Sequence, residues 1–154
     1  MVSVRPGSAG DAAAVVALER EALGSDAWSE NLLTEALSGR VPTTLCLVAE
    51  DDETSQLVGY AAVSVVADLA ELQRIAVAAP RRRSGVASAL LTRVEFEAAS
   101  RHADRVLLEV RDDNSGALAF YARHAFTELS RRERYYADGT TAIVLARAIG
   151  RMEP

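Results

Sequence analysis

The sequence predicts a mixed α/β fold, with a mostly antiparallel central sheet of about seven strands flanked by about four helices. Three observations lead to this prediction. Helix and strand patterns alternate along the chain, three of the strands follow one another directly, and 154 residues suffice for one hydrophobic core. We therefore expect residues 1–154 to form a single domain.

The first half of the chain predicts four strands and two helices. The alternation in Val2–Arg5 indicates a short strand, and either Ser8 or Asp11 caps the helical pattern that follows. Ser29 caps a second helix that ends near Gly39. Three strands then form an antiparallel meander, at residues 44–50, 57–66 and 69–77.

The second half predicts two helices and three strands. A long helix runs from Gly85 to about Arg101, an apolar strand covers residues 106–110, and Asn114 begins another helix. We expect Ala125, just after that helix, to take a left-handed backbone conformation. The last two strands, at residues 126–134 and 140–148, form a hairpin around residues 135–139.

The composition excludes several classes of protein. The hydrophobic content of 49% excludes intrinsic disorder, and the net charge of −5 argues against a nucleic-acid or anionic-membrane partner. All 17 basic residues are arginine. The longest uncharged apolar run, residues 57–67, is too short to span a bilayer, and the chain starts without a secretion signal, so we expect a cytoplasmic protein.

The cysteine and histidine content predicts no metal site. One cysteine, Cys46, and two histidines are too few to bind zinc. Cys46 lies in an apolar run, so we expect it in the core.

The most informative stretch is residues 75–91, which read as a strand, a basic loop and a helix. A loop of small residues that leads into a helix points free backbone N–H groups at one spot, which suits a phosphate. Gly85 and Ala87 allow close approach to the backbone, and Arg81–Arg83 add positive charge. The alternative interpretation is a solvated arginine run before an ordinary helix.

Residues Arg82–Ala87 match the pattern Q/R-x-x-G-x-G/A, and here the chain resembles the GNAT family of N-acetyltransferases. Leu107–Arg111 and Asn114–Tyr121 look like the family's next strand and helix. Trp28–Glu30 and Arg134–Tyr136 resemble the RimI-like branch. That branch acetylates the N-terminal alanine of a small-subunit ribosomal protein.

The resemblance implies a GNAT fold with a V-shaped splay between the fourth and fifth strands. The pyrophosphate of acetyl-CoA would lie against the amides from about Arg83 to Ser88, and the pantetheine arm would run in the splay. The N–H groups of Ile75–Val77 would stabilise the developing oxyanion. The implied acetyl-CoA residues are Ile75, Ala76, Val77, Arg82, Arg83, Ser84, Gly85, Val86, Ala87, Ser88, Asn114 and Tyr121.

The resemblance also implies that Glu109 is the general base and Tyr121 the general acid. Glu109 is notable by itself because it is the only charge within residues 106–110, where loss of water contacts would favour its protonated form. The alternatives are an exposed carboxylate paired with Arg111 or Arg105, and a tyrosine that only packs. Glu71 is a second candidate base, although strand alternation would leave it facing solvent.

Trp28, Glu71, Tyr135 and Tyr136 are candidates for the acceptor-binding wall. Because adjacent residues of a strand point to opposite faces, we expect one tyrosine toward the site and the other away from it. His102 and His124 read as surface residues. The leading hypothesis is that the chain acetylates a protein N-terminus. A further protein could bind this chain as a partner. The alternatives are acetylation of a small-molecule amine, or a CoA-binding partner subunit with little catalysis.

Overall fold

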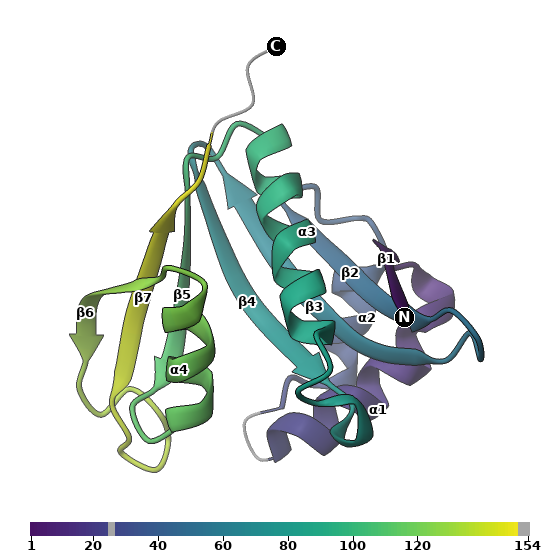
Figure 1. Ribbon diagram of the computed structural model, residues 1–154, viewed down its shortest axis with the longest axis horizontal. Helices are drawn as coiled ribbons and strands as arrows, with labels where there is room; N and C mark the ends of the chain where they lie inside the picture. Colours follow the sequence, from purple (N-terminus) through teal and green to yellow (C-terminus); the bar gives the residue numbers. More distant parts are fainter. Residues whose placement is uncertain (25–26, 151–154) are drawn as a thin grey trace.

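A seven-stranded sheet forms the centre of the molecule in the computed structural model, which describes residues 1–24 and 27–150 (Figure 1). The strands stand in the order β1-β2-β3-β4-β5-β7-β6. Only β4 and β5 pair in parallel, so the mostly antiparallel sheet is confirmed. The bounds are β1 Val2–Pro6, β2 Thr44–Asp51, β3 Leu57–Val66, β4 Leu69–Val77, β5 Arg105–Arg111, β6 Thr127–Arg132 and β7 Ala142–Ala148.

Helices cover both faces of the sheet, in the layers that Figure 1 shows. Helices α1 (Ala12–Leu23) and α2 (Glu30–Leu37) pack on one face, around Cys46, Val48 and Tyr60. Helices α3 (Val86–Ser100) and α4 (Ser115–Arg123) pack on the other face. Two short 3₁₀ helices, η1 (Ala9–Asp11) and η3 (Ala79–Arg81), precede α1 and α3. None of the described helices is long and apolar enough to cross a bilayer.

Capping residues predicted from the sequence lie at the starts of α2, α3 and α4. The Ser29 Oγ accepts a hydrogen bond from the N–H of Leu32 at 3.2 Å, and the Asn114 Oδ1 accepts one from Ala117 at 3.1 Å. Gly85 precedes α3 with a φ of 89°. Ala125 follows α4 with a φ of 67°, so the left-handed conformation expected there is confirmed.

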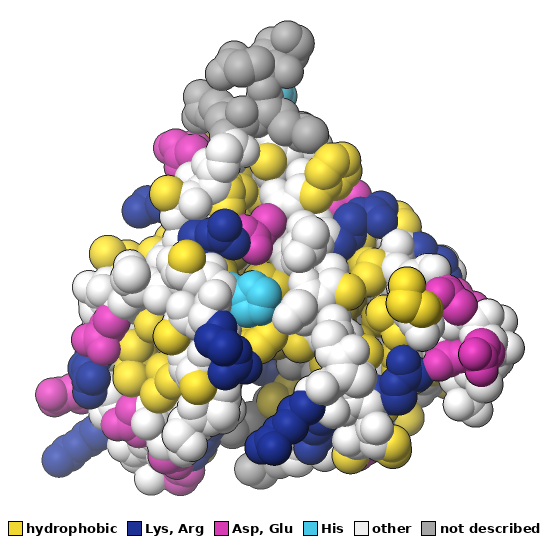
Figure 2. Space-filling view, viewed as in Figure 1, with side chains coloured by type: hydrophobic (Ala, Val, Ile, Leu, Met, Phe, Trp, Pro, Cys, Tyr) yellow, Lys and Arg dark blue, Asp and Glu magenta, His cyan; other side chains and the backbone are white. Residues whose placement is uncertain are grey.

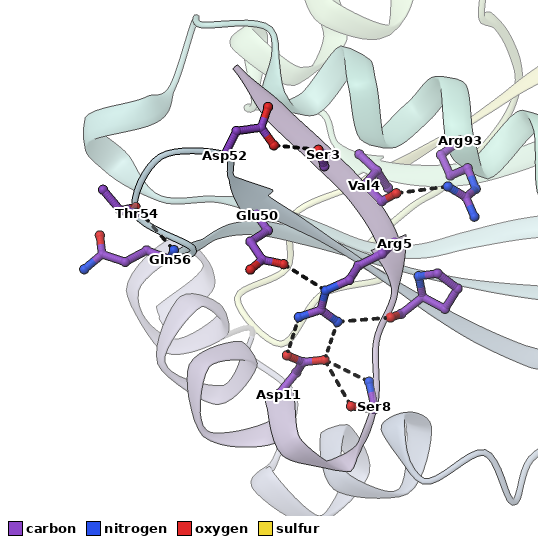
Figure 3. Close-up of polar contacts among 11 residues, drawn as sticks. Ser3, Val4, Arg5, Ser8, Asp11, Glu50, Asp52, Thr54, Gln56 and Arg93 are labelled. Carbon is purple, nitrogen blue, oxygen red and sulfur yellow. Dashed lines mark hydrogen bonds and ion pairs between the residues drawn. The ribbon is translucent and has the colours of Figure 1, made fainter.

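An arginine on β1 fixes the start of α1 against the sheet (Figure 3). The Arg5 guanidinium donates two hydrogen bonds of 2.9 Å to Asp11, just before α1, and one of 2.9 Å to Glu50 of β2. The bonds from Arg5 hold the pKa of Asp11 below its usual range. The network anchors α1, whose last residue, Leu23, lines the site described below.

Strands β4 and β5 separate soon after they pair. Their register joins only Leu69–Glu71 to Arg105–Leu107, and the strands diverge toward the bottom of Figure 1. A bulge lies at this point, since the β3 register passes from Leu72 to Arg74 and leaves Gln73 unmatched. A bulge bends and twists a strand, which helps to open the gap. The V-shaped splay that the family resemblance implied is therefore present.

Candidate active site

Two adjoining cavities occupy the gap between β4 and β5. The larger has a volume of about 940 Å³ and lies between α4 and the loop before α3. The smaller has a volume of about 190 Å³ and reaches the β5 residues 108–111. Figure 2 shows basic side chains on both sides of the hollow between α4 and the start of α3. The cavities share the lining residues Leu23, Ile75, Asn114, Ala117 and Tyr121, so they form one channel.

The loop at the mouth of the channel presents unpaired backbone donors. Within the described chain, no N–H group from Arg83 to Ser88 donates a hydrogen bond to the protein. The last three of these groups belong to the first turn of α3, where a helix has no internal acceptor. Gly85 takes a φ of 89° with nothing within 4 Å of an added Cβ, so its backbone is open to a ligand. The donors and the helix dipole together suit a phosphate.

Two of the loop arginines hold the loop in place. Arg81 forms an ion pair with Asp51 at the end of β2. Hydrogen bonds from the N–H of Thr54 and from Arg81 hold the pKa of Asp51 below its usual range. The Arg82 Nε donates to the carbonyl of Val77 at 3.2 Å, which closes the loop onto the end of β4.

Ten of the twelve residues expected to hold acetyl-CoA line the larger cavity. The exceptions are Ser84 and Val86. The Ser84 hydroxyl donates to the Arg81 carbonyl, and the Val86 side chain is buried in the core, so neither side chain lines the channel. Arg123 and Phe120 also line this cavity, and the sequence interpretation missed both because they lie on α4, away from the motif.

The β4 backbone faces the gap with two further donors. Ala78 donates its N–H to Val58 of β3 at 2.8 Å, and donors alternate along an antiparallel ladder. The N–H groups of Val77 and Ile75 therefore point away from β3, toward β5. Ile75 lies where the two cavities meet, so its N–H can stabilise negative charge that develops on a carbonyl oxygen there.

Glu109 lines the smaller cavity, but it is not desolvated as the sequence predicted. Its side chain is 27% exposed, because Leu107, Glu109 and Arg111 share the β5 face opposite to the buried Leu108 and Val110. Its carboxylate forms an ion pair with Arg132 of β6, at 3.5 Å. The carboxylate therefore keeps contact with water, as a proton acceptor requires.

Tyr121 lies between the two cavities. It is 5% exposed, and its ring packs edge-on against Phe120 and Phe126 at centroid distances of 5.1 and 5.4 Å. Its hydroxyl makes no hydrogen bond to any described residue. Burial raises the pKa of Tyr121, so the hydroxyl stays protonated at neutral pH and serves best as a hydrogen-bond donor.

Tyr135 and Tyr136 lie in the loop between β6 and β7, where their rings meet edge-on at 5.2 Å. The prediction that they occupy opposite faces of a strand is wrong, because β6 ends before them. Tyr136 lines the smaller cavity with the Arg111 guanidinium 4.7 Å from its ring. Hydrogen bonding to Glu109 raises the pKa of Tyr135. Tyr136 therefore borders the site, whereas Tyr135 lies beside Glu109 but lines neither cavity.

Trp28 lines neither cavity, and it contacts two residues that the sequence interpretation missed. Its backbone N–H donates to Glu19 at 2.6 Å, and the Arg74 guanidinium lies 5.0 Å from its ring. Glu19 is completely buried on α1 and accepts hydrogen bonds from Arg74. The sequence could have indicated the burial of Glu19, because Glu19 follows Val15 and Val16 at helical spacing and so lies on the apolar face of the helix.

The channel thus joins a loop with free backbone donors to a carboxylate. Residues 14–126 match the acetyltransferase (GNAT) family. The chain belongs to this family.

Similarity to individual GNAT proteins extends beyond the motif. The chain is 35% identical over 97 residues to the ribosomal protein bS18-alanine N-acetyltransferase of Escherichia coli, covering 61% of this chain and just under two thirds (66%) of that protein. It is 34% identical over 122 residues to the protein of the same name from Salmonella typhimurium, covering 77% and 79%. The crystal structure of the Escherichia coli enzyme superposes with a TM-score of 0.86 at 29% identity, covering 100% and 97%.

The GNAT family uses acetyl-CoA, and the residues of this GNAT chain fit that ligand. The larger cavity offers free N–H groups and arginines to its phosphates, and the gap beside Ile75 offers backbone donors to its acyl end. The thioester would then lie near Glu109 and Tyr121.

Three further predictions concern Glu71 as a second candidate base and the two histidines as surface residues. Glu71 is exposed and lines neither cavity, although its charge acts on Tyr135. His102 is exposed as expected. His124 is half-buried instead, with its Nε2 3.0 Å from the Ser88 Oγ, because it ties the end of α4 to the start of α3.

Proposed function

We propose that this chain transfers an acetyl group from acetyl-CoA to the α-amine of a protein N-terminus, specifically the N-terminal alanine of a small-subunit ribosomal protein. The observation that carries the proposal is the single channel from the phosphate loop to Glu109. The names of the Escherichia coli and Salmonella relatives support the choice of acceptor.

In the proposed mechanism Glu109 accepts a proton from the acceptor ammonium, directly or through water. The neutral nitrogen attacks the thioester carbonyl, a C–N bond forms and the C–S bond breaks. The second proton on that nitrogen passes through water to the departing thiolate, which leaves as the free thiol of CoA. The N–H of Ile75 stabilises the oxyanion. Tyr121 donates a hydrogen bond to the departing thiolate. Because a free thiol has a pKa of about 8.5, below that of a buried tyrosine, full proton transfer from Tyr121 is uphill and the hydrogen bond is its main contribution.

A terminal α-amine matches this site better than lysine. With a pKa of about 7.8, an α-amine is about 14% neutral at pH 7, whereas lysine, at about 10.4, is about 0.04% neutral. The difference is about 3.5 kcal/mol of deprotonation, a large demand on one water-exposed carboxylate.

The charge of the smaller cavity argues against a small polycationic amine as the acetyl acceptor. Its lining holds one carboxylate, Glu109, beside two arginines, Arg74 and Arg111. A site for an aminoglycoside or a polyamine would need an excess of acidic groups.

The test uses the purified chain, acetyl-CoA and a peptide that begins Ala-Arg-Tyr. We expect mass spectrometry to find one acetyl group on the α-amine. The same peptide with a blocked N-terminus and an added lysine should stay unmodified. Binding of acetyl-CoA without turnover on the free peptide or on a panel of amines would contradict the proposal and favour a CoA-binding partner subunit.

The base is tested by Glu109→Gln, with Glu128→Gln on the exposed β6 as the matched control. We expect Glu109→Gln to lower kcat by about 100-fold and to remove the rise of activity with pH, whereas the control keeps both. An unchanged pH profile in Glu109→Gln would overturn Glu109 as the general base and favour Glu71, the second candidate. A cytoplasmic location and a presenting protein partner stay predictions.

A further inference from the structure

The loop between β6 and β7, residues 133–141, forms part of the wall of the smaller cavity. It is mostly exposed, and it carries Tyr136, which lines that cavity. Within the loop, the Gly139 N–H donates to the Tyr136 carbonyl at 2.9 Å, and the Tyr136 N–H donates to the Thr140 carbonyl at 3.2 Å. These bonds shape a turn, but they do not tie that turn to the sheet.

Arg111 ties the loop to the sheet. It is the last residue of β5, whose end lies next to the loop in Figure 1. Its guanidinium forms an ion pair with Asp138 and donates a hydrogen bond of 2.9 Å to the Thr140 hydroxyl. The same group lies 4.7 Å from the centre of the Tyr136 ring. A planar guanidinium suits this task, because it can pair with a carboxylate and stack on a ring at once.

The partner of Arg111 in the loop stays charged at every pH of an enzyme assay. Hydrogen bonds from Thr140 and from Arg111 lower the pKa of Asp138 to about 2. The Arg111 side chain is 22% exposed, whereas Asp138 is 58% exposed and lines neither cavity. Asp138 therefore acts on the site through the loop that carries it.

We infer that Arg111 is a positioning residue, which fixes the loop 133–141 so that Tyr136 stays in the wall of the cavity that receives the acceptor peptide. The inference rests on the proposed function, because it takes a peptide as the acceptor. A loop that is already ordered loses little conformational entropy when the peptide binds. Loss of the Arg111 contacts should therefore weaken peptide binding, while the chemical step and the binding of acetyl-CoA stay intact.

The test measures steady-state kinetics with the peptide that begins Ala-Arg-Tyr, and the acetyl-CoA affinity by calorimetry. We expect Arg111→Gln and Asp138→Asn each to raise the peptide KM about 5-fold, with kcat, its pH profile and the acetyl-CoA Kd unchanged. The double variant should match the single ones, because all three lack the same contact. Arg111→Lys keeps the charge and should regain part of the peptide affinity. Arg105→Gln is the matched control on the same strand, since Arg105 is exposed and lines neither cavity.

A second readout follows the loop directly. Arg134 is exposed within the loop, so trypsin can cut the chain after it. We expect this cleavage to be about 5-fold faster in Arg111→Gln and Asp138→Asn, because the loop opens more often. Cleavage after Arg40, which is exposed outside the loop, should keep its rate and so rule out a general loss of stability.

The possible outcomes separate the positioning role from the proposed function. An unchanged peptide KM in Arg111→Gln and Asp138→Asn would overturn the inference and leave the proposed function standing, even if trypsin cut the loop faster. A lower kcat with an altered pH profile would also overturn it, since Arg111 would then act in the chemical step. Failure of the unmodified protein to acetylate the peptide would overturn the proposed function and the inference together.

Discussion

Glu19 of α1 and Arg74 of β4 form an ion pair at the wall of the smaller cavity. Glu19 is fully buried, the Arg74 side chain is 16% exposed, and the Arg74 Nε donates to the Glu19 Oε2 at 3.0 Å. The Tyr60 hydroxyl donates to the other carboxylate oxygen, and the Trp28 N–H donates at 2.6 Å. One carboxylate thus ties α1, β3, β4 and the segment before α2, and it holds Arg74 at the wall of the smaller cavity.

Replacing Glu19 should show whether its ion pair with Arg74 contributes to stability alone or also to binding of the acceptor peptide. Glu19→Gln removes the buried negative charge that pairs with the Arg74 guanidinium, so we expect a loss of about 3 kcal/mol of unfolding free energy in urea titrations. The exposed Glu35→Gln on α2 should change it by less than about 0.5 kcal/mol. The paired variant Glu19→Leu with Arg74→Met should regain most of the stability and still show a raised KM for the peptide. A normal peptide KM in that folded variant would show that the pair serves stability alone.

Removing the Tyr121 hydroxyl should affect the chemical step only. Tyr121→Phe keeps the ring packed against Phe120 and Phe126. Since the hydroxyl bonds no described residue, we expect an unchanged melting temperature and an unchanged Kd for acetyl-CoA. With the proposed hydrogen bond to the leaving sulfur removed, kcat should fall about 10- to 100-fold. An equal kcat would remove Tyr121 from the mechanism.

Gly85→Ala should weaken cofactor binding, and Gly139→Ala provides the matched control. Both glycines have a φ near 90°, at 89° and 86°, with nothing within 4 Å of an added Cβ. Each variant should lose about 1 kcal/mol of stability from backbone strain. Only Gly85 lines the larger cavity, so calorimetry should show weaker CoA binding for Gly85→Ala alone. Equal CoA affinities in the two variants would contradict a phosphate site at the loop.

Ala125→Gly should stabilise the protein. Ala125 has a φ of 67° after α4, a conformation that glycine adopts with less strain. We expect a gain of about 0.5 to 1 kcal/mol in unfolding free energy. Ala122→Gly, inside the same helix, should instead lose about 1 kcal/mol. A loss in both variants would mean that the alanine methyl group contributes packing that outweighs the strain.

Cys46 should make the fold sensitive to alkaline pH. Burial raises the pKa of the Cys46 thiol to about 11, above its usual value near 9.0. Between these two values the unfolded chain loses the thiol proton and the folded chain keeps it. The contribution to stability is therefore complete below about pH 9 and is lost as the pH rises toward 11, by at most about 2 to 3 kcal/mol. Urea titrations from pH 8 to pH 10.5 should show a smaller decline in Cys46→Ala; equal declines would contradict this assignment.

Much of the candidate site was predictable because its signals are local. The caps of α2 and α4, the left-handed residue after α4 and the strand-loop-helix around Gly85 each depend on residues a few positions apart. The environment of Glu109 was not predictable in this way. A run of apolar neighbours suggested burial, but strand alternation turns Glu109 to a face that β6 and the loop after it leave partly open to water.

The sequence by itself determined the order of strands and helices and the strand-loop-helix around Gly85, since these follow from periodicity and short-range spacing. Its motifs also carried the resemblance to the family that the comparison shows. The tertiary structure alone decided which distant residues meet. Arg74 reaches Glu19 across 55 positions, and Arg123 of α4 faces the loop of Arg83 across one cavity. Such pairings depend on how the sheet opens and how helices pack on it, and local sequence carries no record of either.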